Sequence, residues 1–193
     1  MNFVYKYWAK AGIVLSLLIL LYVYFIQKNK LPLLEKFILL NLSFLMLHQA
    51  EEYVYPGTFK DYFNYRLYNP LGFLRNKLTD KGIFWVNVVL GWGMNIFVLI
   101  FLADNPVAVM IVIVILFYNG LMHFFLSFKT QEYNPGLVTG AILFLPLGFY
   151  SYYKLNLNHL ISTANLFAIM IFSVLASLVI PVTIFLTRDK KHK

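Results

Sequence analysis

Apolar stretches long enough to cross a bilayer recur along this chain and constrain its fold more than any other feature. A membrane-spanning helix needs about 20 predominantly apolar residues. Of the 193 residues, 61% are hydrophobic and 12% are charged, whereas soluble domains average about 45–50% apolar and about 25% charged residues. The sequence therefore predicts an all-α, polytopic transmembrane helical bundle of about six spans, with residues 1–193 forming a single domain. The predicted spans are Ala11–Ile26, Leu33–Glu52, Ile83–Leu102, Val107–Phe128, Leu137–Tyr153 and Ile161–Leu186.

Composition also limits the chemistry and the partners. The chain has no cysteine, which excludes disulfides, thiolate catalysis and cysteine-based zinc sites. Its net charge of +8 is carried by residues between the apolar stretches, with no basic face of useful length. We therefore expect contact with membrane lipid and not with nucleic acid. The first span has the basic flank of a signal peptide, but bulky residues 22–27 follow it, which favours an uncleaved helix.

The connection between the second and third spans has a composition of its own. In residues 53–82 aromatic side chains alternate with lysines and arginines, and Pro56-Gly57 and Asn69-Pro70 interrupt the segment. Aromatic and basic side chains together are typical of the headgroup region of a membrane. The sequence predicts an interfacial aromatic and basic segment here.

The distribution of basic residues predicts the orientation. Six spans place both termini on one face of the membrane, and this face would carry twelve of the 16 basic residues: Lys6, Lys10, Lys60, Arg66, Arg75, Lys77, Lys81, Lys129, Arg188, Lys190, Lys191 and Lys193. The opposite face would carry Lys28, Lys30, Lys36 and Lys154. Because cytoplasmic loops are enriched in lysine and arginine, we predict a multi-pass protein of the cytoplasmic membrane with both termini in the cytoplasm.

A cluster of ionisable residues closes the second span. His48, Glu51 and Glu52 are spaced i, i+3 and i+4, so a helix brings them to one face. The simplest interpretation is that they mark where the helix leaves the membrane. Two adjacent carboxylates at the negative end of a helix dipole are unfavourable, however. This cost favours a functional cluster.

The predicted topology brings other polar residues to the same depth. Asn119 and His123 stand four apart late in the fourth span, and a turn containing Tyr133 and Asn134 leads to Thr139. Asn95 lies roughly 18 Å deep in the third span at about 1.5 Å per residue, where asparagine commonly links helices by hydrogen bonds. Gly136 and Gly140 give the fifth span a small face suited to close packing.

Two kinds of chemistry fit these residues. His48, Glu51, Glu52 and His123 can hold a divalent metal with a position left for water or substrate. The same four side chains can instead work as general acids and bases without a metal. Asn95, Asn119, Tyr133, Asn134 and Thr139 would support them. The sequence has neither H-E-x-x-H nor Glu-x-x-His, so spacing alone does not choose between the two.

Three short motifs in order resemble one known family. His48–Glu52, then Asn119–His123, then Tyr133–Thr139 resemble the signatures of the HXXEE-domain family of bacterial membrane proteins, over roughly Leu33–Phe149. The resemblance implies a multi-span helical protein with enzymatic activity, defined by His48, Glu51 and Glu52. The family has no established reaction.

The leading functional hypothesis is a small membrane-embedded enzyme that acts on a lipid or another apolar substrate at a cytoplasm-facing His/Glu site. A cation- or proton-coupled transporter of small solutes is the first alternative, although no inverted repeat is visible. A non-catalytic scaffold that packs a partner through the last two spans is the second.

Overall fold

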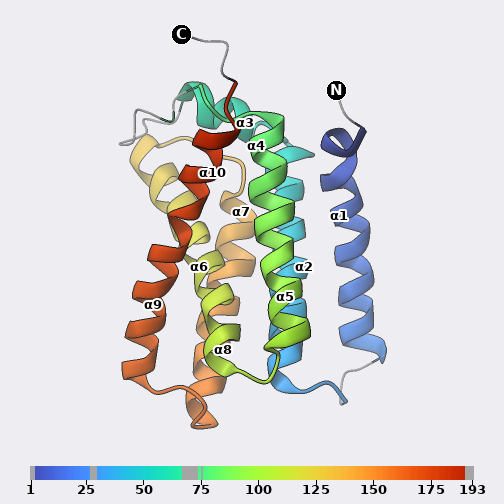
Figure 1. Cartoon of the computed structure of the whole chain (residues 1–193), viewed down its shortest axis with the longest axis vertical. Helices are drawn as coiled ribbons and strands as arrows, with labels where there is room; N and C mark the ends of the chain where they lie inside the picture. The colour runs from blue at the N-terminus through green and yellow to red at the C-terminus, as the bar shows by residue number, and fades with distance from the viewer. Residues whose placement is uncertain (1–2, 27–29, 67–73, 75, 190–193) are drawn as a thin grey trace.

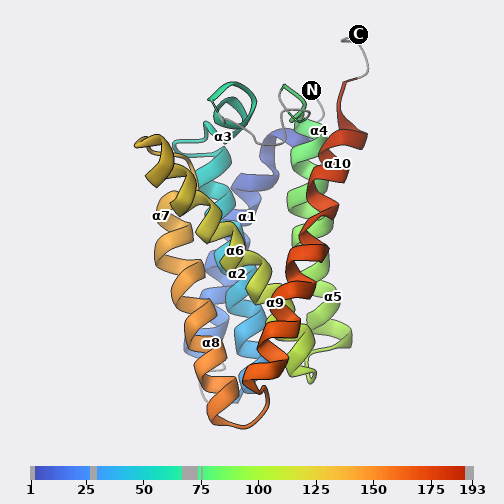
Figure 2. The same cartoon turned by 90° about the vertical axis from the view of Figure 1, so that its left-hand side faces the viewer.

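The computed structural model describes residues 3–26, 30–66, 74 and 76–189, and these residues form helices and connecting turns without any β-strand. Helical segments run up and down along one axis and pack as a bundle (Figures 1 and 2). In chain order they are α1 (Phe3–Leu21), η1 (Tyr22–Ile26), α2 (Leu33–Tyr53), α3 (Phe59–Asp61), η2 (Tyr62–Arg66), α4 (Asp80–Phe84), η4 (Trp85–Trp92), α5 (Gly93–Phe101), α6 (Pro106–Thr130), α7 (Leu137–Thr139), η5 (Gly140–Phe144), α8 (Leu145–Leu157), α9 (Thr163–Ser177) and α10 (Val179–Thr187), where η marks π-helical turns. The all-α prediction is confirmed.

Five helical runs among the described residues are long and apolar enough to cross a membrane. They are Phe3–Phe25, Leu33–Tyr53, Asp80–Phe101, Pro106–Thr130 and Thr163–Thr187. Large apolar side chains such as Leu17, Phe97 and Phe172 lie exposed on their outer faces, as expected where the surroundings are lipid. The chain is therefore a multi-pass membrane protein, and five of the predicted spans are found.

The predicted span Leu137–Tyr153 differs from the other five. The helical run continues without a break through α7, η5 and α8 from Leu137 to Leu157, but it is not among the five runs that qualify by length and hydropathy. The polar side chains of Tyr150–Lys154 lower the mean hydropathy of its second half. This run lies alongside α6, and both chain termini lie at the same end of the bundle (Figures 1 and 2).

The predicted interfacial segment lies at the end of the bundle that also holds the termini. Residues 53–66, 74 and 76–82 of it are described, and residues 67–73 and 75 lie outside the described part. Here α3 packs against the end of α2, and α4 begins at the same end of the bundle (Figures 1 and 2). The Asn64 side chain accepts a hydrogen bond from the Leu78 backbone N–H and donates one to the Leu78 carbonyl, both at 3.0 Å. These bonds hold η2 against the approach to α4.

Polar contacts fix the rotation of α2 within the bundle. The hydroxyls of Ser16 on α1 and Ser43 on α2 lie 2.7 Å apart. Asn41 donates to the side chain of Asn95 on α5 at 2.8 Å, and Trp92 donates to the side chain of Gln49 at 2.7 Å. Interhelical hydrogen bonds of this kind contribute about 0.6–2 kcal/mol each in membranes. The face of α2 that does not contact α1, η4 or α5 is directed toward α6.

Helix α6 and the run that follows it approach each other at glycines. A Cβ atom added to Gly120 would lie 2.9 Å from the Gly140 carbonyl oxygen, and one added to Gly140 would lie 3.0 Å from the Gly120 Cα. Backbones this close bring the turn before α7 beside the late part of α6. The prediction of close helix packing is thus confirmed for Gly140, whereas Gly136 does not lie at this contact between helices.

Candidate functional site

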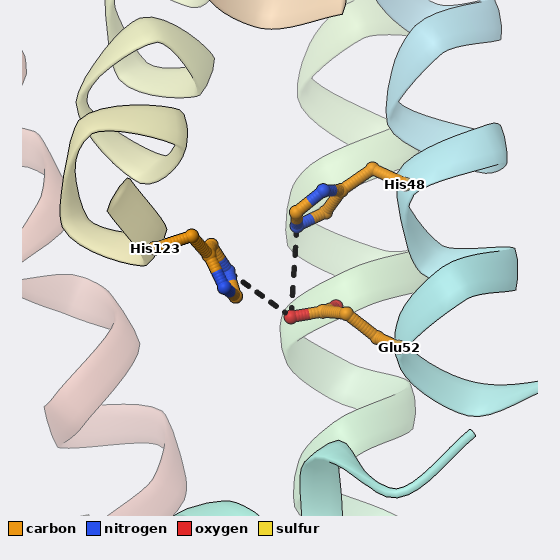
Figure 3. A group of neighbouring side chains, drawn as sticks. All are labelled: His48, Glu52 and His123. Carbon is orange, nitrogen blue, oxygen red and sulfur yellow. Dashed lines mark ion pairs between the residues drawn. The ribbon is translucent and has the colours of Figure 1, made fainter. Parts of the chain in front are cut away.

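Two histidines and one glutamate meet inside the bundle. Oε1 of Glu52 lies 3.6 Å from Nε2 of His48 and 3.5 Å from Nε2 of His123. The three potential ligand atoms all lie within 4.8 Å of one another, and Figure 3 shows both rings turned toward the same carboxylate. The side chains are about 1%, 6% and 5% exposed for His48, His123 and Glu52. We refer to these three residues as the His/Glu triad.

The helices place the triad by simple geometry. His48 and Glu52 stand one turn apart on α2, so their side chains lie on the same face. Helix α6 crosses this face and supplies His123 (Figure 3). The Phe59 ring of α3 lies 5.6 Å from the His123 ring, and the Phe144 ring of η5 lies 4.6 Å from the His48 ring. The triad is therefore enclosed by aromatic side chains.

The hydrogen-bond network determines which nitrogen of His48 carries a proton. The Thr139 hydroxyl donates its single proton to Oε2 of Glu51 at 2.5 Å. It lies 2.9 Å from Nδ1 of His48, so it can only accept there. Nδ1 must therefore be the protonated nitrogen, which leaves the lone pair of the neutral ring on Nε2, toward Glu52.

The same reasoning applies to His123. Asn134 is fully buried, and its amide nitrogen donates to the His123 carbonyl oxygen at 2.8 Å. Its Oδ1 then faces Nδ1 of His123 at 2.5 Å. An amide oxygen is only an acceptor, so Nδ1 carries the proton. The lone pair of Nε2 again points to Glu52.

With both imidazoles neutral, three electron-pair donors are directed at one another. Nε2 of His48 is buried and has no hydrogen-bond partner, which is costly unless a proton, a water molecule or a metal ion lies between the donors. A tetrahedral ion with ligand distances of about 2.0–2.2 Å separates neighbouring ligand atoms by roughly 3.3–3.6 Å. The two separations from Glu52, 3.5 and 3.6 Å, match that range and exceed the usual length of an N–H···O hydrogen bond, about 2.7–3.2 Å. The three ligand atoms as a set lie within 4.8 Å of one another. The separations of Glu52 from the two histidines therefore suit a shared metal ion.

Glu51 has a different environment from Glu52 and does not join the triad. Its carboxylate accepts hydrogen bonds from the Tyr133 hydroxyl at 2.7 Å, from the backbone N–H of Val138 at 3.1 Å and from that of Thr139 at 2.8 Å. The Thr139 hydroxyl is a fourth donor. Burial and the hydrogen bond to Glu51 raise the pKa of the Tyr133 hydroxyl, which keeps it protonated as a donor. The sequence placed Glu51 among the candidate ligands, and the structure places it behind His48 as an anchor for the turn that enters α7.

Gly136 belongs to the site, although its spacing from Gly140 predicted a role in helix packing. It has φ = +104°, a conformation that side chains other than glycine rarely adopt. A Cβ atom there would lie 2.5 Å from Cε1 of His123 and 2.7 Å from Cε1 of His48. Gly136 therefore leaves room for both imidazole rings. Its place in a turn two residues after Asn134 was the sequence feature that could have indicated this role.

The other predicted supporting residues lie on either side of the triad. Tyr133, Asn134 and Thr139 contact it directly or through Glu51, as described above. Asn95 is buried and bonds to Asn41 and to the Gly91 carbonyl, so it links α2 to the η4–α5 run. Asn119 lies one turn before His123, and its Oδ1 is buried without a hydrogen-bond partner.

Thr139 offers a direct test of the hydrogen-bond network. Thr139→Val removes the hydroxyl between His48 and Glu51 and keeps the shape of the side chain. If the triad holds a metal, we expect zinc affinity to fall about 10–100-fold, because partners of metal-bound histidines orient the ring. Equilibrium dialysis of the detergent-purified protein measures this. Thr183→Val on α10, which removes a hydroxyl that bonds to its own helix, should leave the affinity unchanged. Equal affinities for wild type and Thr139→Val would contradict the network.

Comparison with known proteins gives one match. The family described as "Protein of unknown function with HXXEE motif" matches residues 39–151, which include every triad residue. No curated protein matches the chain, and no solved structure matches it.

Proposed function

We propose a function for this chain, which belongs to the family of proteins of unknown function with an HXXEE motif: it is a membrane-embedded, metal-dependent enzyme that hydrolyses a lipid. One observation carries the proposal. The unprotonated nitrogens of His48 and His123 converge on the Glu52 carboxylate at separations that suit a four-coordinate divalent ion.

The residues present fit such an ion. Two imidazoles and one carboxylate form a ligand set used by catalytic zinc sites, which leaves the fourth position open. Zinc bound there would lower the pKa of a water molecule to about 7 and polarise a carbonyl or phosphoryl oxygen. One carboxylate leaves a net charge of +1 on the site, which favours an anionic nucleophile or a developing oxyanion.

The surrounding residues have separate tasks in this proposal. Thr139 and Asn134 accept the Nδ1 protons and keep both rings in the ligating tautomer. Glu51 compensates charge behind His48 through the Thr139 hydroxyl. Phe59 and Phe144 cover the rings and exclude water, which strengthens electrostatic interactions in the site.

Two alternative functions receive less support. Acid–base catalysis without a metal uses the same three side chains, but it gives no reason for the buried Nε2 of His48 to face Glu52 without a hydrogen-bond partner. A transporter would place its site near mid-membrane, whereas His48 and Glu52 stand in the last two turns of α2, beside α3 (Figure 1).

The membrane arrangement belongs to the same proposal. We place six helical runs across the bilayer, with Leu137–Leu157 as the fifth, and the termini and the triad on the cytoplasmic side. The shared position of the termini (Figure 1) and the excess of lysine and arginine at that end support this orientation.

A labelling experiment tests hydrolysis for any lipid in a natural mixture. Zinc-loaded wild-type protein and Glu52→Gln would be reconstituted with a total polar lipid extract in water enriched in oxygen-18, and the lipids analysed by mass spectrometry. Hydrolysis inserts one water oxygen into a product, so we expect a labelled lipid product with wild type and none above background with Glu52→Gln. Identical lipid profiles for the two proteins would refute the proposed activity.

A further inference from the structure

A cleft within the membrane region lies next to the triad. Its volume is about 440 Å³, in the range of small-molecule sites. Helices α2 and α6 form its inner wall, η4 and α5 one side, and α9 and α10 the other. Most of its lining is apolar. Val89, Phe97 and Val179 line it and are also exposed on the outer surface, so the cleft opens sideways toward lipid.

The cleft lies close to the level of the triad along the axis of the bundle. Its inner wall includes Leu45, one turn before His48 on α2, and Asn119, one turn before His123 on α6. Both helices run toward the triad end of the bundle, so Leu45 and Asn119 lie about 5–6 Å deeper than the triad, at 1.5 Å per residue, while Gln49 lines the cleft at the level of His48. A chain-like ligand in the cleft would thus have one end toward the triad and the rest toward mid-membrane.

A short apolar cluster connects the two. Leu45 and Leu116 line the cleft and pack in one cluster with Phe144. The Phe144 ring in turn lies 4.6 Å from the His48 ring. Phe144 therefore lies between this end of the cleft and the His48 ring, and its movement would join the cleft to the triad.

The cleft also contains polar groups that differ in their bonding. Gln49 and Asn87 line it and bond to each other at 3.1 Å. Asn119 lines it as well, and its buried Oδ1 has no partner, so a rotation of this side chain toward the cleft would let it accept from a ligand hydroxyl or amide. One wall is the π-helical η4, and π-helical turns occur often at functional sites.

We propose that this cleft binds a single acyl chain of a bilayer lipid and that this lipid is the substrate of the triad. The inference rests on the proposed function, because it names the substrate class of the same site. An apolar cavity open to the membrane selects an apolar chain over a soluble metabolite. Its Asn119 acceptor, on the triad side of α6, would bind a polar group near the lipid head.

Photo-crosslinking tests the occupant directly. Wild-type protein would be reconstituted in phosphatidylcholine vesicles that contain a phosphatidylcholine with a diazirine in its acyl chain, and the adducts mapped by mass spectrometry. We expect adducts on Leu116 and Asn119, because Leu116 is about 6% exposed and only a lipid inside the cleft reaches it. Adducts confined to outward-facing residues would overturn the proposal.

Matched variants test lipid binding in the cleft independently of zinc binding at the triad. Ala176→Trp, which places a large side chain in the cleft, should reduce these adducts about tenfold by filling the cavity. Ala164→Trp, on the exposed start of the same helix, should leave them unchanged. Zinc content should be equal in all three proteins. Unchanged adducts in Ala176→Trp would refute lipid binding in the cleft and leave the proposed function standing. Labelling of Leu116 in a wild-type protein that binds no zinc would refute the proposed function and leave lipid binding standing.

Discussion

The Glu52→Gln variant is expected to bind zinc at least about 100-fold more weakly than wild type, because loss of a ligand exceeds the roughly 10–100-fold effect of losing a ligand's partner. Glutamine has the same shape but no negative charge. It therefore keeps the packing of α2 and removes the anionic donor that both Nε2 atoms face. Equilibrium dialysis against zinc measures the affinity, and thermal unfolding in the same detergent shows that the variant folds.

Controls on the same helix make this result specific. Glu35→Gln changes a carboxylate in the first turn of α2, at the opposite end from the triad, and should bind zinc as wild type does. Glu51→Gln should lie between the two, since Glu51 acts through Thr139 and His48. An equal loss of affinity in Glu51→Gln and Glu52→Gln would mean that the distinction between these neighbours is wrong.

The Gly136→Ala variant is expected to lose zinc binding and stability together. The added methyl group would lie 2.5 Å from His123 and 2.7 Å from His48, so both rings must move from the positions in which they face Glu52. The positive φ adds strain of about 1–3 kcal/mol. Zinc content after desalting and the midpoint of thermal unfolding are the two measurements.

A variant at a second glycine distinguishes the effect of backbone strain on zinc binding from the effect of displacing the imidazole rings. Gly57 has φ = +71°, and a Cβ atom there would meet the Val54 carbonyl oxygen at 3.0 Å. Gly57→Ala should therefore lose stability and still bind zinc. If it lost zinc to the same extent as Gly136→Ala, the effect at Gly136 would reflect general destabilisation.

Local sequence patterns were sufficient for most of the bundle. Apolar runs predicted five of the spans because the length of such a run reflects the thickness of a bilayer. The run Leu137–Leu157 shows the limit of this reasoning. Its tyrosines and Lys154 make it less apolar, yet its helix is held against α6 by the Gly120–Gly140 contact, which involves residues far apart in sequence.

The site was predictable where it depends on helical spacing or on depth. Spacing on α2 identified His48 and Glu52, and the depth of the fourth span identified His123. The different environments of Glu51 and Glu52 were not predictable, because neighbouring residues point about 100° apart on a helix and the rotation of α2 depends on its contacts with α1 and α5. Gly136 was missed for a related reason: only the folded bundle brings both imidazoles to it.

X-ray absorption at the zinc edge tests the central claim most directly, because it reports the atoms around the metal in the zinc-loaded wild-type protein. The triad predicts a four-coordinate shell of nitrogen and oxygen at about 2.0–2.1 Å, with the outer scattering of two imidazole rings. A shell without imidazole scattering, or a protein that retains no zinc after desalting, would contradict a metal centre formed by His48, Glu52 and His123.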